Sequence, residues 1–169
     1  MKKITLQKLA FISGAEIPKE AHEKVLEEFH QASDNIVEVL LSAAAIEIIV
    51  KTLIRDYFVT GDKEKKRLFQ NVVTLSDSFS FRHAKRAIKE ILPLIGMNED
   101  DSKALDKCLQ DVMNYRNRLV HGKPEYRDGK FIISFYDNRH REEVLDDKYW
   151  DGVTKAFEGT FKLLGRYMQ

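Results

Sequence analysis

The sequence has little cysteine, proline or glycine. Its 169 residues include 1 Cys, 3 Pro and 8 Gly. The single cysteine, Cys108, excludes a disulfide within the chain and a cysteine-rich zinc site, and it fits a reducing, cytoplasmic setting. Because proline and glycine interrupt regular structure, their scarcity permits long uninterrupted elements.

The sequence also lacks an excess of charge of either sign. Lys and Arg total 28 against 27 Asp and Glu, which leaves a formal net charge of +1. No bulk field therefore indicates a nucleic-acid or membrane partner, although a balanced chain can still carry a local basic patch. The 43% hydrophobic content is typical of a folded protein, and the length predicts a single domain over residues 1–169.

No apolar run reaches membrane-spanning length. The most apolar stretch, residues 36–50, is interrupted by Glu38 and Glu47 and falls short of the roughly 20 residues that a spanning helix needs. The N-terminus begins with a positive charge, but Gln7 and Lys8 interrupt its apolar run, which argues against an export signal. We therefore expect no membrane partner and a cytoplasmic location.

What the sequence does contain is helical periodicity over most of its length. Apolar residues recur at spacings of three and four in five segments: residues 18–58 (one helix, or two that meet near 33–35), 63–75, 80–92, 104–120 and 147–168. Residues 130–136 differ, since they are rich in β-branched and aromatic residues and lie between turn signals. The pattern predicts an all-α bundle of about four to six helices, with a small β-strand or hairpin inserted before the last helix.

One helix carries an arginine where its apolar stripe predicts a buried residue. Arg116 continues the stripe of Leu105, Leu109 and Val112 at spacings of three and four, and Leu119 follows it. A guanidinium in that position costs several kcal/mol unless it is paired or faces a wet interface. The arginine therefore needs either a partner or a shared surface.

Two more polar residues follow on the same helix. Asn117 and His121 are four residues apart and share one face, whereas His121 lies about 140° around the helix from Arg116. A long arginine side chain can reach across that angle in a frayed last turn. Arg116, Asn117 and His121 are therefore the candidate catalytic residues.

The segment Tyr115–Gly122 resembles the signature of the HEPN (higher eukaryotes and prokaryotes nucleotide-binding) superfamily. That signature is an arginine, a polar residue, a short apolar spacer and a histidine, near the end of a helix in an α-helical bundle. Arg116, Asn117 and His121 match these positions, and Gly122 follows. The helical layout is similar to that of the family over about residues 29–168.

The resemblance implies metal-independent cleavage of RNA by the neighbouring 2′-hydroxyl, which leaves a cyclic phosphate and needs no cofactor. His121 would act as the general acid/base, because histidine titrates near neutrality, and Arg116 would stabilise the charge on the phosphate. Asn117 would orient His121 or the phosphate. Many members are homodimers whose motif helices face each other, so the stripe around Arg116 would be an interface. Toxin and phage-defence nucleases belong to this class, which adds an antitoxin or another protein as an expected partner.

Several alternatives remain open. Arg116 would be purely structural if it paired with an acidic residue such as Glu47, although Glu47 is also placed to pair along its own helix with Lys51. His121 at a helix C-terminus is favoured by the helix dipole. A non-catalytic HEPN-like module that binds a partner protein or a nucleotide is the alternative function. The balanced charge favours it slightly, whereas the intact motif favours the enzyme.

Other basic residues are weaker candidates for RNA contact. Arg118 lies off the face of Arg116, so we expect it to be solvent-exposed or at most an auxiliary phosphate contact. A second basic face on the helix of residues 80–92 would track a phosphate backbone; it consists of Arg82, Lys85, Arg86 and Lys89. No histidine has the spacing of a metal site, and we expect Cys108 to be a small buried apolar residue rather than a nucleophile.

Overall fold

The computed structural model describes residues 22–76 and 78–167. Along these residues the elements are α1 (His22–Phe58), α2 (Lys63–Phe69), the π-helix η2 (Gln70–Thr74), α3 (Phe81–Ile91), the 3₁₀-helix η3 (Leu92–Ile95), α4 (Glu99–His121), β1 (Lys123–Arg127), β2 (Lys130–Tyr136), β3 (His140–Val144) and α5 (Asp147–Arg166). The predicted helical architecture is confirmed, with the β insertion before the last helix. The class all-α is not strictly right, because the insertion is a complete three-stranded sheet.

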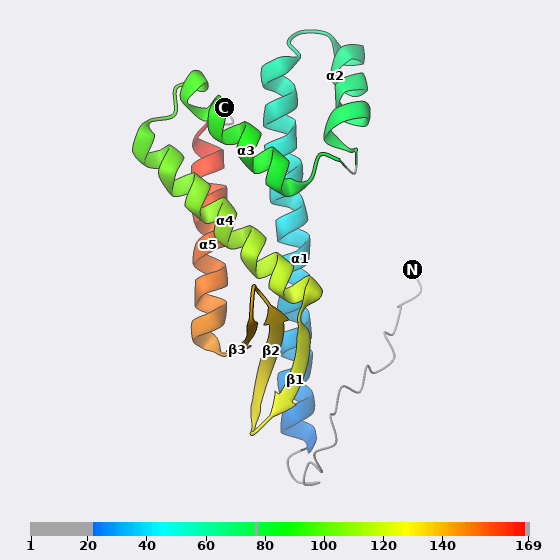
Figure 1. Cartoon of the computed structure of the whole chain (residues 1–169), viewed down its shortest axis with the longest axis vertical. Helices are drawn as coiled ribbons and strands as arrows, with labels where there is room; N and C mark the ends of the chain where they lie inside the picture. The colour runs from blue at the N-terminus through cyan, green and yellow to red at the C-terminus, as the bar shows by residue number, and fades with distance from the viewer. Residues whose placement is uncertain (1–21, 77, 168–169) are drawn as a thin grey trace.

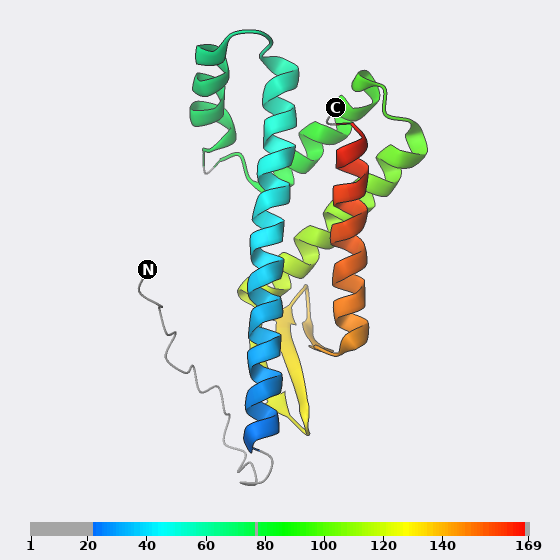
Figure 2. The same ribbon diagram turned by 180° about the vertical axis from the view of Figure 1, so that it is seen from behind.

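α1 is the longest helix described, and α2, η2, α3, α4 and α5 all contact it. It runs without interruption for 37 residues, so the alternative of two helices that meet near residues 33–35 is wrong. From Val39 onward its buried residues follow at spacings of three and four: Val39, Ala43, Ile46, Val50 and Ile54. α5 lies beside α1 and runs in the same direction, while α4 crosses both of them obliquely (Figures 1 and 2). The predicted start at Pro18 lies outside the described residues.

The sheet is an antiparallel meander in the order β1-β2-β3. Asp128 and Gly129 both have positive φ angles (52° and 74°), which suits the tight turn that joins β1 to β2. Only β2 carries the apolar pattern that predicted a strand, and its Ile133 and Phe135 enter the core. β1 and β3 pair with it although their sequences, KPEYR and HREEV, are polar. Tertiary pairing therefore creates two strands that local pattern does not indicate.

The helices and the sheet share one hydrophobic core. On α5 the residues Val153, Phe157 and Leu164 are buried. Trp150 on the same helix is only partly buried and Phe161 is 40% exposed. The last residue of the helix predicted over 147–168 lies outside the described residues. Among the helices described, none is long and apolar enough to cross a membrane.

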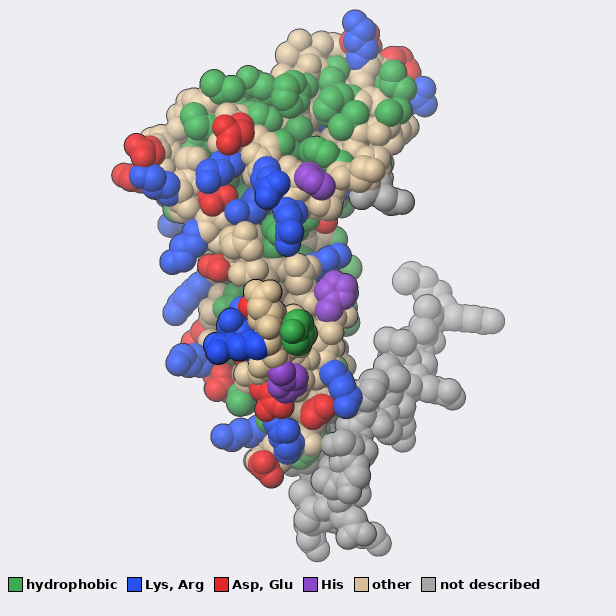
Figure 3. All heavy atoms as spheres, in the orientation of Figure 1, with side chains coloured by type: hydrophobic (Ala, Val, Ile, Leu, Met, Phe, Trp, Pro, Cys, Tyr) green, Lys and Arg blue, Asp and Glu red, His purple; other side chains and the backbone are tan. Residues whose placement is uncertain are grey.

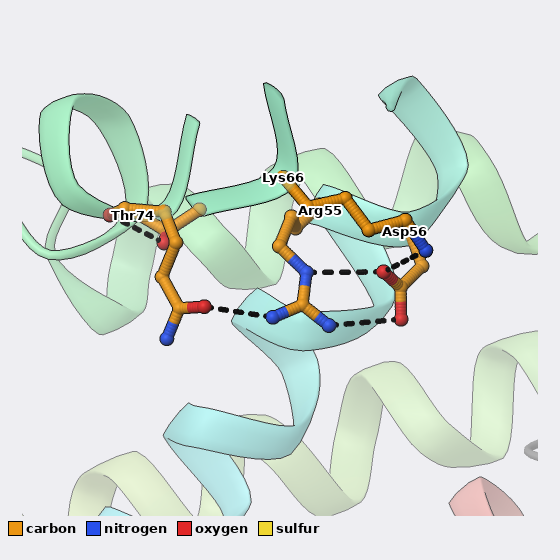
Figure 4. Close-up of polar contacts among 5 residues, drawn as sticks. Arg55, Asp56, Lys66 and Thr74 are labelled. Carbon is orange, nitrogen blue, oxygen red and sulfur yellow. Dashed lines mark hydrogen bonds and ion pairs between the residues drawn. The ribbon is translucent and has the colours of Figure 1, made fainter. Parts of the chain in front are cut away.

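Polar contacts hold α2 and η2 against the end of α1, since α2 buries none of its own residues. The Arg55 guanidinium donates to both carboxylate oxygens of Asp56 (3.0 and 3.1 Å) and to Oε1 of Gln70 (2.7 Å), and Lys66 pairs with Asp56 at 2.9 Å (Figure 4). The hydrogen bond from Arg55 and the pairing with Lys66 hold the pKa of Asp56 below its usual range. The helix predicted over residues 63–75 changes to π-helical geometry at Gln70, whose side chain accepts the hydrogen bond from Arg55.

Candidate functional site

The candidate residues lie in the last two turns of α4, where the helix meets the sheet. Asn98 caps the start of α4, since its side-chain oxygen accepts a hydrogen bond from the Asp101 N–H at 2.8 Å. It ends at His121, and after Gly122 the chain enters β1 directly. The N–H of Gly122 donates to the carbonyl oxygen of Arg118 at 2.7 Å, which closes the last turn. The position of His121 is therefore tied to the start of the sheet.

Gly122 is required by close packing. A Cβ atom at this position would lie 2.3 Å from the carbonyl oxygen of Arg118 and 2.6 Å from Cγ1 of Ile133 on β2. Its φ of −79° is accessible to any residue, so backbone strain is not the reason for glycine here. The sequence indicated a helix end at this glycine, and the structure adds that the sheet packs against it without room for a side chain.

Arg116 is half-buried, between the buried positions of Val112 and Leu119 on the same stripe. Its Nη1 donates to Oδ1 of Asn117 at 3.0 Å. Across residues 22–76 and 78–167, no carboxylate forms an ion pair with it. Glu47, the alternative partner, pairs with Lys51 at 2.8 Å, as its position along α1 predicted. Most of the guanidinium donors are therefore free to bind an anionic ligand.

Asn117 contacts Arg116 rather than His121. Its side-chain oxygen is occupied by the arginine, and no hydrogen bond joins it to the histidine in the described structure. The structure therefore shows Asn117 in contact with Arg116, and the expectation that it orients His121 or the phosphate stays a prediction. The hydrogen bond holds one guanidinium nitrogen toward Asn117.

His121 is exposed, and within the part of the chain that the structure describes it makes no hydrogen bond or ion pair. The structure thus brings Arg116 and Asn117 into contact and leaves the imidazole free. A free imidazole at the surface can take up and release a proton with a substrate.

Arg118 is half-buried rather than fully exposed to solvent, which corrects the prediction. Its guanidinium pairs with Glu143 on β3 at 2.9 Å and lies over the rings of Tyr115 and Phe135, at 5.5 and 5.2 Å from their centroids. Tyr115 in turn packs edge-on against Tyr149 of α5. Arg118 therefore joins α4 to the sheet. Nothing in the sequence near Arg118 indicates this, because Glu143 is 25 residues away.

Arg118→Ala is expected to destabilise the protein by about 1–2 kcal/mol, because it removes a partly buried ion pair and two cation–π contacts. Urea unfolding measures the change. The matched control is Arg139→Ala, since Arg139 is exposed in the turn between β2 and β3, and its stability should change by less than about 0.5 kcal/mol. Unchanged stability of Arg118→Ala, together with weaker RNA binding, would instead make Arg118 a phosphate contact.

The second basic face lines a hollow between α3 and α4. The hollow has a volume of about 360 Å³ and is lined by Arg82, Lys85, Arg86, Lys89, Asp106 and Gln110. Asp106 pairs with Lys85 at 2.8 Å and lies 3.8 Å from Lys89. Arg82 and Arg86 are exposed, and neither of them forms an ion pair with another described residue. Figure 3 shows Lys and Arg side chains gathered across this face, over α3 and beside α4. The sequence predicted that the four basic residues share one face of α3. It did not predict that Asp106 and Gln110 of α4 line the same hollow, because that depends on tertiary packing.

Two further hollows lie along α1 and α5, of about 430 and 300 Å³. Carboxylates occur on the walls of both; in the larger they are Glu28, Asp146 and Asp147. Neither hollow includes a residue of the motif. Carboxylates outnumber cations in both hollows, although Lys130 lines the larger one, and this charge disfavours a polyanion, so the motif and the basic hollow are the better candidates for RNA contact.

Cys108 is half-buried against α5, with its Sγ 3.0 Å from the place where a Cβ of Gly159 would lie. Burial raises the pKa of the Cys108 thiol, so the reactive thiolate is disfavoured. In the described residues, no group of three or more His, Cys, Asp or Glu is arranged to hold a metal ion.

No protein-family model matches the chain, and neither does any curated protein or any solved structure.

Proposed function

We propose that the protein is a metal-independent RNA endonuclease of the HEPN type, with Arg116 and His121 as catalytic residues. The observation that carries the proposal is the half-buried guanidinium of Arg116, which lacks a carboxylate partner among the described residues and lies one turn from an exposed imidazole. A structural arginine at such a position is normally paired, because a partly desolvated cation is otherwise costly. A phosphate group would supply the missing negative charge.

The chemistry follows from the two side chains. His121 takes the proton from a 2′-hydroxyl, and the 2′ oxygen attacks the adjacent phosphorus. The bond from phosphorus to the 5′ oxygen of the next nucleotide breaks, and that oxygen takes up a proton from water, while the protonated His121 releases its proton to solvent. Arg116 stabilises the charge on the non-bridging oxygens, for which its planar guanidinium is suited. Asn117 positions Arg116 through their hydrogen bond. The products are a 2′,3′-cyclic phosphate and a 5′-hydroxyl.

A homodimer with facing α4 helices completes the site. His121 and Arg116 point about 140° apart around α4, so one helix does not direct both at one phosphate. Val120, four residues after Arg116, is apolar yet 44% exposed, which favours its burial by a second copy. Two α4 helices packed through this side would place Arg116 of each copy nearer to His121 of the other.

The test is cleavage of total cellular RNA by the purified protein in excess EDTA. We expect cleavage with 2′,3′-cyclic phosphate ends and no cleavage of a strand made of 2′-deoxynucleotides, since that strand lacks the attacking oxygen. Solution mass measured under the same conditions should give a dimer. A requirement for added Mg²⁺, or the absence of any cleavage, would contradict the proposal.

The alternative is a non-catalytic HEPN-like module that binds a partner protein or a nucleotide. A specific surface favours a protein partner: α1 exposes a stripe of apolar residues that the described part of the chain leaves uncovered, namely Val37 (51% exposed), Leu41 (67%) and Ile48 (59%). An antitoxin or a phage-defence partner that restrains a nuclease would also bind such a stripe. Intact RNA in the EDTA experiment would favour the non-catalytic module.

A further inference from the structure

The hollow between α3 and α4 carries a local excess of positive charge that the protein itself leaves unbalanced. Four cations line it, against the single carboxylate of Asp106. Asp106 is engaged with Lys85 and Lys89, so Arg82 and Arg86 face solvent without a partner among the described residues. Arginines arranged in this way match the geometry of phosphate oxygens.

A polar line on α4 connects this hollow to the motif. Gln110 lines the hollow, and it is followed on the same helix face by Asn114, Asn117 and His121, at spacings of four, three and four. The side-chain amide of Gln110 donates to Oδ1 of Asn114 at 2.9 Å. All four side chains are exposed or half-buried, so the line is open to solvent. Amide groups of this kind hydrogen-bond to sugar and phosphate oxygens without adding charge.

The length of this line suits a short single strand. From Gln110 to His121 the helix rises by about 16 Å, at 1.5 Å per residue. At about 3.4 Å per nucleotide this distance corresponds to roughly five stacked nucleotides, and to fewer if the strand is extended. A strand whose phosphate lies in the hollow can therefore present a later phosphodiester at the end of α4.

We infer that the hollow between α3 and α4 is a phosphate-anchoring subsite for single-stranded RNA, and that the Gln110–Asn114–Asn117 line guides the strand from it to His121. The inference rests on the proposed function, because it takes the end of α4 as the place of cleavage. It adds a binding site remote from the reacting phosphate, together with a fixed distance between the anchored nucleotide and the cleaved one.

Binding of an uncleavable strand tests the subsite independently of catalysis. The probe is a fluorescein-labelled 12-nucleotide strand with 2′-O-methyl groups, titrated by fluorescence anisotropy between 50 and 200 mM salt. Loss of two phosphate contacts in the Arg82→Gln/Arg86→Gln variant should reduce the slope of log K against log salt by about 1.4. If the variant and the wild type bind equally at 1 M salt, this difference in slope makes the variant bind roughly 25-fold more weakly than the wild type at 0.1 M salt.

The control variant, Lys155→Gln/Lys162→Gln, removes the same charge from exposed positions on α5. It should bind the strand like the wild type. Equal loss in both double variants would show that binding follows net charge alone, and wild-type affinity in Arg82→Gln/Arg86→Gln would exclude the hollow. Inorganic phosphate, added at the concentration of phosphate groups in the strand, should not displace the strand. Displacement would mean that the hollow binds a free phosphate ion, and this would also contradict the inference.

The line on α4 has a separate test. Asn114→Asp places a negative charge midway along it without changing the size of the side chain, so binding of the same strand should weaken several-fold, and more at 50 mM than at 200 mM salt. Asn71→Asp, at an exposed position of η2, is the matched control. Equal effects of the two substitutions would exclude the path along α4.

The two proposals fail in different ways. Binding that depends on Arg82 and Arg86, without any cleavage by the wild type, would support the subsite and contradict the nuclease activity. Cleavage in EDTA with strand affinity unchanged in Arg82→Gln/Arg86→Gln would support the nuclease activity and contradict the subsite.

Discussion

His121→Ala is expected to slow RNA cleavage in EDTA by about 10²–10⁴-fold, because the variant loses the group that transfers the proton. Arg116→Ala is expected to lose about 10²–10³-fold, the usual effect of removing one donor that stabilises charge on the reacting oxygens. Arg116→Lys should recover only part of this loss, since a lysine keeps the charge but not the planar pair of donors. The rate of cyclic phosphate formation measures all three.

The structure predicts that these variants fold. His121 is exposed, and Arg116 gives up one hydrogen bond, to Asn117, which is worth about 1 kcal/mol. His140→Ala is the matched control, because His140 is an exposed histidine on β3 outside the motif. Wild-type rates in His121→Ala would refute the catalytic role. Equal losses in His140→Ala would trace the effect to general damage.

Mixing the two inactive variants tests the shared cleft. If each site takes Arg116 from one copy and His121 from the other, a mixed dimer of Arg116→Ala and His121→Ala has one site with both residues intact. Exchange of subunits should then restore part of the activity. No recovery, in a mixture proven to contain mixed dimers, would place both residues of each site on one chain.

Gly122→Ala is expected to have the largest effect on stability, about 1–3 kcal/mol, since over-packing in a close contact has this cost. The added methyl group would meet the carbonyl oxygen of Arg118 and the side chain of Ile133, so α4 and β2 would have to move apart. Urea unfolding measures the loss. Cleavage should fall as well, because the same movement displaces His121.

Gly165→Ala is the matched control for this substitution. Gly165 lies in α5 with no atom within 4 Å of the place that its Cβ would occupy, so alanine should stabilise the helix by up to about 1 kcal/mol. The two glycine substitutions should thus have opposite signs. A Gly122→Ala variant as stable as the wild type would mean that the contact between α4 and the sheet yields easily.

Helical periodicity predicted the helices well because each buried stripe is a local pattern. Arg116 was correctly placed among apolar neighbours for this reason. A single strand or a hairpin was predicted at residues 130–136, but a three-stranded sheet was not, because pairing with β2, and not their own polar sequences, makes β1 and β3 strands. Arg118 was misplaced because its partners, Glu143 and Phe135, come from the sheet.

The candidate site shows the same limit. The basic face of α3 was visible as spacing along one helix, but Asp106 and Gln110 join it only where α4 packs against α3. Likewise, the contact of Asn117 with Arg116 depends on side-chain conformation, which spacing does not specify. The HEPN resemblance and the nuclease activity stay predictions.

The position of α1 has a consequence for biosynthesis. Its buried stripe is covered by α3, α4 and α5, which are made after it, and α5 begins only at Asp147. At roughly 5–20 residues per second, a ribosome needs about 5–20 seconds to synthesise the chain from the end of α1 at Phe58 to the end of α5 at Arg166. During that interval the longest helix of the protein exposes its apolar face on the nascent chain. A chaperone that shields such faces during translation should therefore raise the yield of folded protein.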